Sequence, residues 1–422
     1  MMEPISLQPG VTLRCVTDRR FRHGCLSVQL VEPMTRASAA PGALLPSVLL
    51  RGTRQRPDLR RITLHLDDLY GASVSAQVRR VGDLRTTGFY ASFLEDRYAL
   101  PGDRVLAPMA EFLAELLLDP AMENGIFRAD YVESEKKNLI STIESEKNDK
   151  RAYAAARMLE RMCRGDSFGI PRLGRTEDAE AVTPDSLTAY YRTLLDTAPV
   201  ELCYVGGAAP EAVAALLRPM AAALARHVSP LPSQTPFRDA GDGGDVVETM
   251  DVAQGKLCLG FVTPVTNRDP RFAAMQVFNT LFGGGMTSKL FRNVREKQSL
   301  CYAIGSGYYG SKGIVTVSAG IDSGCRDRVQ AEILRQLDLC RAGNITDAEL
   351  TAAREALLSG LRAVHDSPGA MESYYETAAL SGSGRTPETY MEEIRAVTAA
   401  DAAAAARTVR LHTGYFLKGA ET

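Results

Sequence analysis

The sequence predicts an α+β protein of two similar lobes, joined by a linker close to the middle of the chain. Residues 228–244 are rich in Pro, Gly, Ser and Asp and lack a periodic apolar pattern, which is typical of a linker. The strand-like and helix-like segments before this stretch recur after it in the same order. Such a duplication favours two similar domains, which we place at residues 1–230 and 245–422, with the linker at 231–244.

The first half opens with two strand-like runs and continues with helical and strand-like segments. A charged turn at 18–24 separates the two opening runs, so we expect them to form a hairpin. Further on, the alternation of Val74, Ala76 and Val78 with other residues predicts a strand with one buried face. The expected strands are 11–17, 25–32, 72–81, 84–94 and 201–207, and the expected helices are 40–51, 58–70, 104–118, a single long helix over about 128–165, and one that begins at the TPDS of 183–186.

The second half repeats this order of elements, which is the observation that supports the duplication. The corresponding segments are 246–252 and 256–263 with the opening hairpin, 271–282 with 40–51, 301–321 with 71–94, and 396–419 with 181–207. Each half is therefore expected to contain one sheet with its own helices.

Composition excludes several classes of function. A net charge of −2 gives no broad electrostatic reason to bind nucleic acid or an anionic membrane. The sequence shows no basic start followed by an apolar run and no uncharged apolar stretch of membrane-spanning length. The eight cysteines are scattered without a CxxC, which favours reduced thiols over disulfides. We therefore expect a cytoplasmic protein that binds neither nucleic acid nor membranes.

Residues 278–309 carry the most specific pattern in the chain. An apolar helical segment leads to Gly283, Gly284 and Gly285, and a second helix is expected to start near Thr287. Ser288 can cap that helix by accepting a hydrogen bond from a backbone N–H of its first turn. The aromatic and apolar content of 300–309 predicts a strand whose glycines allow another backbone to approach. Taken alone, the three glycines favour an ordinary helix–glycine–helix corner followed by a strand.

The string FGGGMTSKLFRNVREKQSLCYAIGS resembles the signature of the C-terminal half of insulinase/pitrilysin-type (M16) peptidases, which include the mitochondrial processing peptidases. The resemblance extends more loosely over nearly the whole chain. It implies two lobes, each an antiparallel sheet covered by helices, that close like a clamshell around a peptide. It also implies that Arg295 and Tyr302 hold the substrate backbone and that Gly283, Gly284 and Gly285 line the peptide path. The alternative is structural: Arg295 pairs with Glu296 or another neighbour, and Tyr302 packs on a strand.

The zinc motif expected from this resemblance is missing. Family hydrolases carry HxxEH on a helix, with two histidines as zinc ligands and a glutamate as general base. Alignment on Gly52 and Thr53 puts Ala43 and Ser47 at the histidine positions and Pro46 at the glutamate position. Alanine and proline side chains cannot bind zinc or transfer a proton, and a neutral serine is a very poor ligand. We therefore expect no metal site and no catalytic residue in this chain.

The third zinc ligand is replaced as well. The family places this glutamate seven residues after the first member of an EK pair, and Glu135-Lys136 fixes that register at Thr142. Glu144 and Glu146 are offset on the helix, so they face other directions, and the mixed charges of this helix are typical of a solvated face. His65, the nearest alternative histidine, has no second histidine at metal-ligand spacing.

The resemblance therefore implies a non-catalytic M16-like subunit. It would form a heterodimer with a paralogue that bears the zinc, bind the peptide substrate, and be inactive as a peptidase on its own. A helical segment of the first half, ESEKKNLISTIESEKNDKRAYAAARM, looks closest to the zinc-less member of a bacterial pair named for an association with elongation factor P modification. The alternatives are a peptide- or protein-binding scaffold with no role in hydrolysis and a self-sufficient peptidase that uses other residues.

Overall fold

The structure is a computed structural model that describes residues 4–224, 227–238 and 243–419. The chain divides into two compact units, and neither unit is continuous in sequence. Unit 1 consists of residues 1–144, 170–233 and 364–380, and unit 2 consists of the remaining segments, 145–169, 234–363 and 381–422. Each unit therefore includes one short segment from the other half of the sequence. Residues 239–242 of the predicted linker lie outside the described residues.

Unit 1 is built on a six-stranded sheet with the order β1-β2-β8-β3-β5-β4. Neighbouring strands run antiparallel, except that β2 and β8 are parallel. The strands are β1 (Ile5–Gln8), β2 (Val11–Thr17), β3 (His23–Pro33), β4 (Ser73–Val81), β5 (Leu84–Leu94) and β8 (Val200–Gly206). A separate two-stranded sheet pairs β6 (Met122–Glu123) with β7 (Ile126–Phe127).

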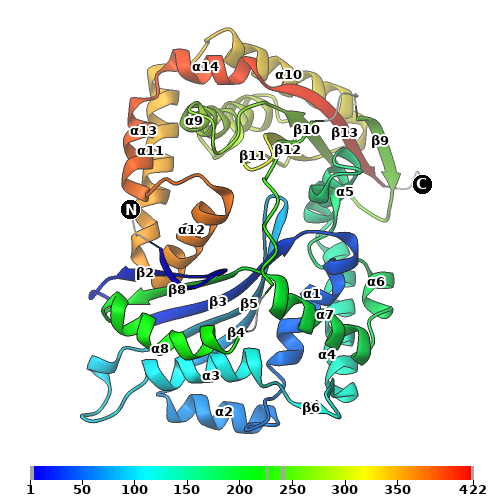
Figure 1. The fold of residues 1–422 in the computed structure, drawn as a ribbon. Helices are drawn as coiled ribbons and strands as arrows, with labels where there is room; N and C mark the ends of the chain where they lie inside the picture. Colours follow the sequence, from blue (N-terminus) through cyan, green and yellow to red (C-terminus); the bar gives the residue numbers. More distant parts are fainter. Residues whose placement is uncertain (1–3, 225–226, 239–242, 420–422) are drawn as a thin grey trace. The chain divides into compact units, whose positions relative to one another are not determined.

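Helices cover both faces of this sheet. One face packs on α1, α3, α7 and α8 in a large apolar core, and the other face packs on α12, which comes from the second half of the sequence (Figure 1). The helices of unit 1 are α1 (Arg36–Leu49), α2 (Leu59–Asp68), α3 (Leu106–Leu118), α4 (Ala129–Ser145), α6 (Thr176–Glu180), α7 (Pro184–Thr197), α8 (Pro210–Ala222) and α12 (Pro368–Ser381).

The five-stranded sheet of unit 2 repeats the topology of unit 1. Its order β11-β12-β10-β13-β9 corresponds to β4-β5-β3-β8-β2, and β9 and β13 form its parallel pair. The strands are β9 (Gly244–Thr249), β10 (Gly255–Val262), β11 (Ala303–Tyr309), β12 (Ile314–Ile321) and β13 (Arg410–Lys418). Matching order and direction in the two sheets confirm the predicted internal duplication and the α+β class.

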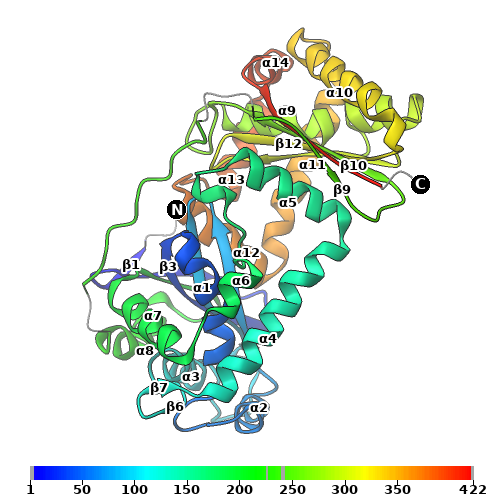
Figure 2. The same ribbon diagram turned by 90° about the vertical axis from the view of Figure 1, so that its right-hand side faces the viewer.

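Helix α5 covers one face of the unit 2 sheet and is contributed by the first half of the sequence. Its Met158 and Met162 pack with Cys258 of β10 and Tyr415 of β13. The other face lies under α9, with α10 and α14 beyond it (Figure 2). The helices of unit 2 are α5 (Lys150–Met162), α9 (Phe272–Gly283), α10 (Arg326–Arg341), α11 (Asp347–Ala363), α13 (Pro387–Ala396) and α14 (Ala399–Arg407), together with the π-helix η4 (Phe291–Lys297).

The predicted opening hairpin is wrong. The runs at 11–17 and 25–32 do form β2 and β3, but β8 lies between them and pairs with both. The corresponding strands β9 and β10 of unit 2 are separated by β13 in the same way. The charged turn predicts that the two runs lie next to each other in the sheet. In the structure, β8, which comes from a distant part of the sequence, lies between them.

The single long helix predicted over 128–165 is also wrong. Helix α4 ends at Ser145, and α5 begins at Lys150 after a short 3₁₀ turn. Asp149 caps α5, since its carboxylate accepts hydrogen bonds from Arg151 N and Ala152 N at 3.0 Å each. The cap competes with a continuous helix, and α5 instead buries its apolar face on the sheet of unit 2.

Two other helices begin at capping boxes, one of them where predicted. Helix α7 begins at the TPDS sequence, where the Thr183 and Ser186 side chains form a reciprocal capping box and Pro184 occupies the first turn. Helix α1 begins earlier than the predicted residue 40, because Thr35 and Ser38 form a second capping box ahead of it.

Candidate functional site

The glycine turn follows α9 and lies against β11, the edge strand of the unit 2 sheet. A Cβ atom at Gly283 would lie 2.6 Å from Ser306 Oγ, so only glycine allows this close approach. Ser306 Oγ also donates a hydrogen bond to the α9 carbonyl of Asn279 at 3.0 Å. Gly284 and Gly285 are exposed, and a Cβ at Gly285 would meet nothing within 4 Å. The turn is therefore buried at Gly283 and exposed at Gly284 and Gly285, and of the three glycines Gly285 has room for a side chain.

Arg295 lies on the π-helix η4 that follows this turn. Ser288 caps the helical segment as predicted, since its Oγ accepts a hydrogen bond from Phe291 N at 3.3 Å. Val294 is fully buried, whereas Arg295 is exposed and its guanidinium carbon lies 4.5 Å from the centroid of the Phe291 ring. π-Helical turns are rare and are frequently found at functional sites. The Arg295 guanidinium is thus presented to solvent on an aromatic support.

Tyr302 lies directly before β11, and its backbone N–H extends the pairing with β12 by donating to Gly320 O at 2.8 Å. Its side chain is 54% exposed, and its hydroxyl donates a hydrogen bond to Asp322 Oδ1 at 2.9 Å. That hydrogen bond raises the pKa of Tyr302, so the phenol stays protonated and remains a donor.

Arg295 and Tyr302 therefore come from neighbouring segments of one unit, each with its own partner. Both side chains are exposed. Tyr302 is not packed into a core, and the described contact of Arg295 is with Phe291. The exposed guanidinium can donate hydrogen bonds to backbone carbonyls or a carboxylate, and the phenol can do so if its proton leaves Asp322.

The positions of the zinc motif lie in unit 1. Ala43 and Pro46 of α1 are buried in the apolar core, and Ser47 is partly buried. Thr142 of α4 donates its hydroxyl proton to the carbonyl of Asn138 at 2.8 Å within its own helix. Glu135, the residue that set the register, pairs with Arg51 at 3.2 Å. The side chains of Ala43, Pro46, Ser47 and Thr142 offer zinc no nitrogen, sulfur or carboxylate ligand.

His65 is also engaged in packing. Its Nδ1 lies 3.3 Å from Arg56 Nη2, and its ring packs edge-on to Phe112 at 5.0 Å between centroids. Burial lowers the pKa of His65, and the neighbouring Arg56 charge adds to this effect. Across the described residues, no group of three His, Cys, Asp or Glu side chains is arranged to hold a metal ion.

Pro46 removes a helical hydrogen bond from α1, and a neighbouring strand replaces it. Proline has no N–H to donate to the carbonyl four residues earlier, which belongs to Gly42. Thr87 of β5 donates its hydroxyl proton to that carbonyl at 3.2 Å. The buried Thr87 side chain therefore replaces the helical hydrogen bond that Pro46, at the general-base position, cannot make.

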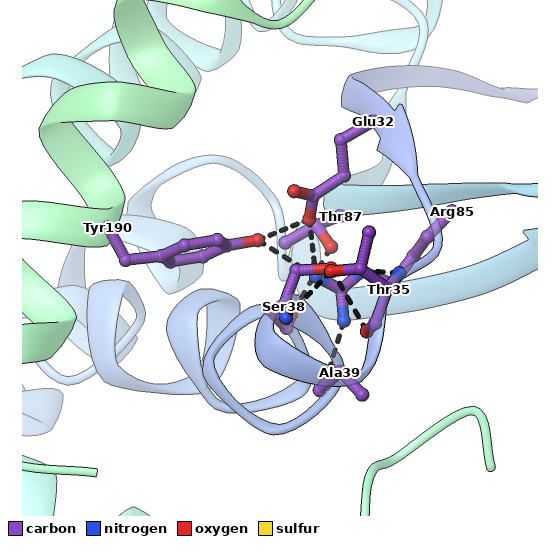
Figure 3. Close-up of polar contacts among 8 residues, drawn as sticks. Glu32, Thr35, Ser38, Ala39, Arg85, Thr87 and Tyr190 are labelled. Carbon is purple, nitrogen blue, oxygen red and sulfur yellow. Dashed lines mark hydrogen bonds and ion pairs between the residues drawn. The ribbon is translucent and has the colours of Figure 1, made fainter. Parts of the chain in front are cut away.

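A buried ion pair lies beside the same turn of α1 (Figure 3). Arg85 of β5 is fully buried, pairs with Glu32, and donates to the Ala39 carbonyl at 2.7 Å and to the Tyr190 hydroxyl at 2.8 Å. A Cβ at Gly42 would lie 1.8 Å from Arg85 Nη2, so the guanidinium occupies the space that a larger helix residue would need. This region of α1 is thus arranged for packing.

In the described part of the chain, no helix is both long enough and apolar enough to cross a lipid bilayer.

Comparison with known proteins places the chain in a family. Residues 181–357 match the family model described as Peptidase M16 inactive domain. The "Probable inactive metalloprotease YmfF" of Bacillus subtilis is 30% identical over 414 residues, covering 98% of this chain and 96% of that protein. The crystal structure of a conserved protein from Enterococcus faecalis V583 superposes with a TM-score of 0.92 at 27% identity, covering 100% and 99% of the two chains.

A crystal structure of a peptidase M16 inactive domain from Pseudomonas fluorescens has the same fold, with a TM-score of 0.82 at 17% identity over 100% of this chain and 98% of that one. The full-length similarity to the Bacillus protein agrees with the resemblance drawn from the glycine-rich signature. The chain therefore belongs to the M16 peptidase family, as an inactive M16-like protein.

Proposed function

We propose that this protein is the non-catalytic subunit of a two-chain M16 peptidase, in which it binds peptide and supports a zinc-bearing paralogue in peptide processing. The observation that carries the proposal is the contrast between its two halves. The zinc-ligand positions of α1 and α4 hold Ala43, Ser47 and Thr142, and the general-base position holds Pro46. Arg295, in contrast, is exposed on η4, which follows the turn of 283–285.

The chemistry of the exposed groups suits a peptide backbone. The planar guanidinium of Arg295 can hold two carbonyl oxygens or one carboxylate, and the Tyr302 hydroxyl supplies a further donor when it exchanges Asp322 for the peptide. Both lie close in sequence to the start of β11, an edge strand that contains Gly305 and Gly307. An edge strand with small residues offers backbone N–H and C=O groups to an extended peptide. A peptide bound there would meet both donors.

Hydrolysis by an M16 peptidase requires a water molecule activated by zinc. In this proposal the partner chain holds that zinc. We place the heterodimer in the cytoplasm, a compartment that keeps thiols reduced, because the cysteines of this chain are thiols and seven of the eight are buried.

The test is to purify this chain and a zinc-bearing M16 paralogue from the same organism, separately and as a mixture. Elemental analysis should find stoichiometric zinc only where the paralogue is present, and the mixture should cleave quenched fluorescent peptides faster than the paralogue alone. Arg295→Ala and Tyr302→Phe in this chain should each lower kcat/KM of the mixture by about tenfold, the loss expected for one hydrogen bond to a charged group or a carbonyl.

Arg104→Ala is the matched control, because Arg104 is an exposed arginine of unit 1 far from this segment in sequence. Stoichiometric zinc in this chain alone would reopen the reading as a self-sufficient peptidase. Peptide binding that depends on Arg295 without any gain in cleavage would favour the scaffold alternative, including one linked to elongation factor P modification.

A further inference from the structure

The π-helix η4 is attached to α10 by a line of hydrogen-bonded polar side chains. Asn293 Nδ2 donates to Gln336 Oε1 at 2.9 Å, and Gln336 Nε2 donates to Glu332 Oε1 at 2.7 Å. Arg335 then donates two hydrogen bonds to the Glu332 carboxylate at 2.7 and 2.8 Å. Gln336 is fully buried and Glu332 is nearly so. We call Asn293, Gln336, Glu332 and Arg335 the polar chain.

The donors and acceptors along the polar chain are fixed in one direction. The hydrogen bonds from Arg335, together with those from Gln336 and Gln298, lower the pKa of Glu332 to about 2, so its carboxylate is ionised and can only accept. Gln336 must therefore turn its amide nitrogen toward Glu332 and its oxygen toward η4. As a result, the side chain at position 293 must be a donor.

Two further contacts hold the same segment. Lys289 is only 6% exposed, and its Nζ lies 2.8 and 2.9 Å from the two carboxylate oxygens of Glu349 on α11. Gln298, directly after η4, is hydrogen-bonded to Glu332. Polar anchors therefore lie before, within and after η4. Arg295 lies between Asn293 and Gln298 on the exposed side.

We propose that the polar chain positions Arg295, because the hydrogen bond from Asn293 to Gln336 fixes η4 on α10. This inference rests on the proposed function, in which Arg295 holds the substrate. Apolar side chains would pack η4 on α10 at similar or lower cost than buried polar ones. Directional hydrogen bonds, in contrast, specify one arrangement of the turn, and a fully satisfied buried network is rigid. A misplaced side chain that contacts substrate can lose up to about a hundredfold in rate.

Asn293→Asp is a sharp test because it keeps the size of the side chain and replaces the donor with an acceptor that faces Gln336 Oε1. In the mixture with the zinc-bearing paralogue, quenched fluorescent peptides are the probe. We expect kcat/KM to fall about tenfold when Arg295 is present. In an Arg295→Ala background, Asn293→Asp should cause little further loss. Asn148→Asp, at an exposed position of unit 2, is the matched control and should have no effect.

Hydrogen exchange of this chain alone measures the anchoring without partner or peptide. Amides of residues 291–300 should exchange faster in Asn293→Asp than in the wild type, and at the wild-type rate in Asn148→Asp. Equal losses of kcat/KM in both Arg295 backgrounds, or unchanged exchange in 291–300, would overturn the positioning role. If Arg295→Ala alone leaves kcat/KM intact, the proposed function fails and the role of Asn293 fails with it, whereas the exchange result still reports on the anchoring. The two failures are therefore distinguishable.

Discussion

The packing of α12 on the unit 1 sheet should depend on pH through one buried carboxyl group. Glu372 and Glu376, one helical turn apart on α12, are 0% and 3% exposed, and both pair with Arg79 of β4. Glu376 Oε1 has no hydrogen-bond partner among the described residues. Two carboxylates thus share one guanidinium in a buried site, where a second negative charge is unfavourable.

This environment raises the pKa of Glu376 from 4.5 to about 7, chiefly because of burial and then because of the Glu372 charge, against the opposing effect of Arg79. Glu201 of β8 adds to the increase. Between these two pKa values the folded protein keeps the proton and the unfolded chain releases it. The contribution to stability is therefore complete below about pH 4.5 and is lost as the pH rises through about 7.

A shift of this size corresponds to about 3 kcal/mol at roughly 1.4 kcal/mol per pKa unit. Glu376→Gln removes the titration, so its free energy of unfolding relative to the wild type should increase by about 3 kcal/mol between pH 4.5 and 8. For a unit of this size, that corresponds to a relative gain of roughly 6–12 °C in melting temperature.

Thermal unfolding followed by circular dichroism at several pH values measures this difference directly. Glu111→Gln, at an exposed position of α3, is the control and should follow the wild type throughout. If Glu376→Gln and the wild type lose stability in parallel from pH 5 to 8, Glu376 does not bind the extra proton and the reasoning is refuted.

Three further predictions concern the packing of α1 and the buried thiols. Thr87→Val should cost about 1–3 kcal/mol, because it leaves the Gly42 carbonyl without a donor at the position opposite Pro46. Gly42→Ala should cost about 3–5 kcal/mol, since the added Cβ would displace the buried Arg85 guanidinium from Glu32. Both changes are measured by denaturant unfolding. A colorimetric thiol titration of the native protein should find one fast thiol, Cys325, because the other seven cysteines are buried.

Matched controls separate these effects from a general loss of packing. Thr86 is buried, and its hydroxyl has no hydrogen-bond partner among the described residues, so Thr86→Val should be neutral or stabilising. Gly360 lies inside α11 with nothing within 4 Å of an added Cβ, and Gly360→Ala should stabilise by about 0.5–1 kcal/mol. Equal effects at positions 86 and 87, or at 42 and 360, would contradict the structural explanation. A second native thiol as reactive as Cys325 would contradict the burial pattern.

The sequence by itself determined the features that depend on local chemistry. Capping at Thr183 and Ser288, the alternation that forms β4, and the repeat of elements in the second half could all be predicted, because each arises from residues close together in the chain. The glycine-rich signature likewise indicated the family, and the substitutions at the zinc-motif positions could be seen, since motif positions are read along the sequence.

Only the tertiary structure decided how distant segments meet. Strand β8 lies between β2 and β3, and α5 and α12 each pack in the unit formed mainly by the other half of the sequence. These arrangements depend on contacts between apolar surfaces that are far apart in sequence, so local patterns do not predict them. The polar chain that begins at Asn293 could not be predicted for the same reason. Gln336 and Glu332 resemble ordinary exposed residues of a helix, and their burial and directed hydrogen bonds exist only once α10 packs against η4.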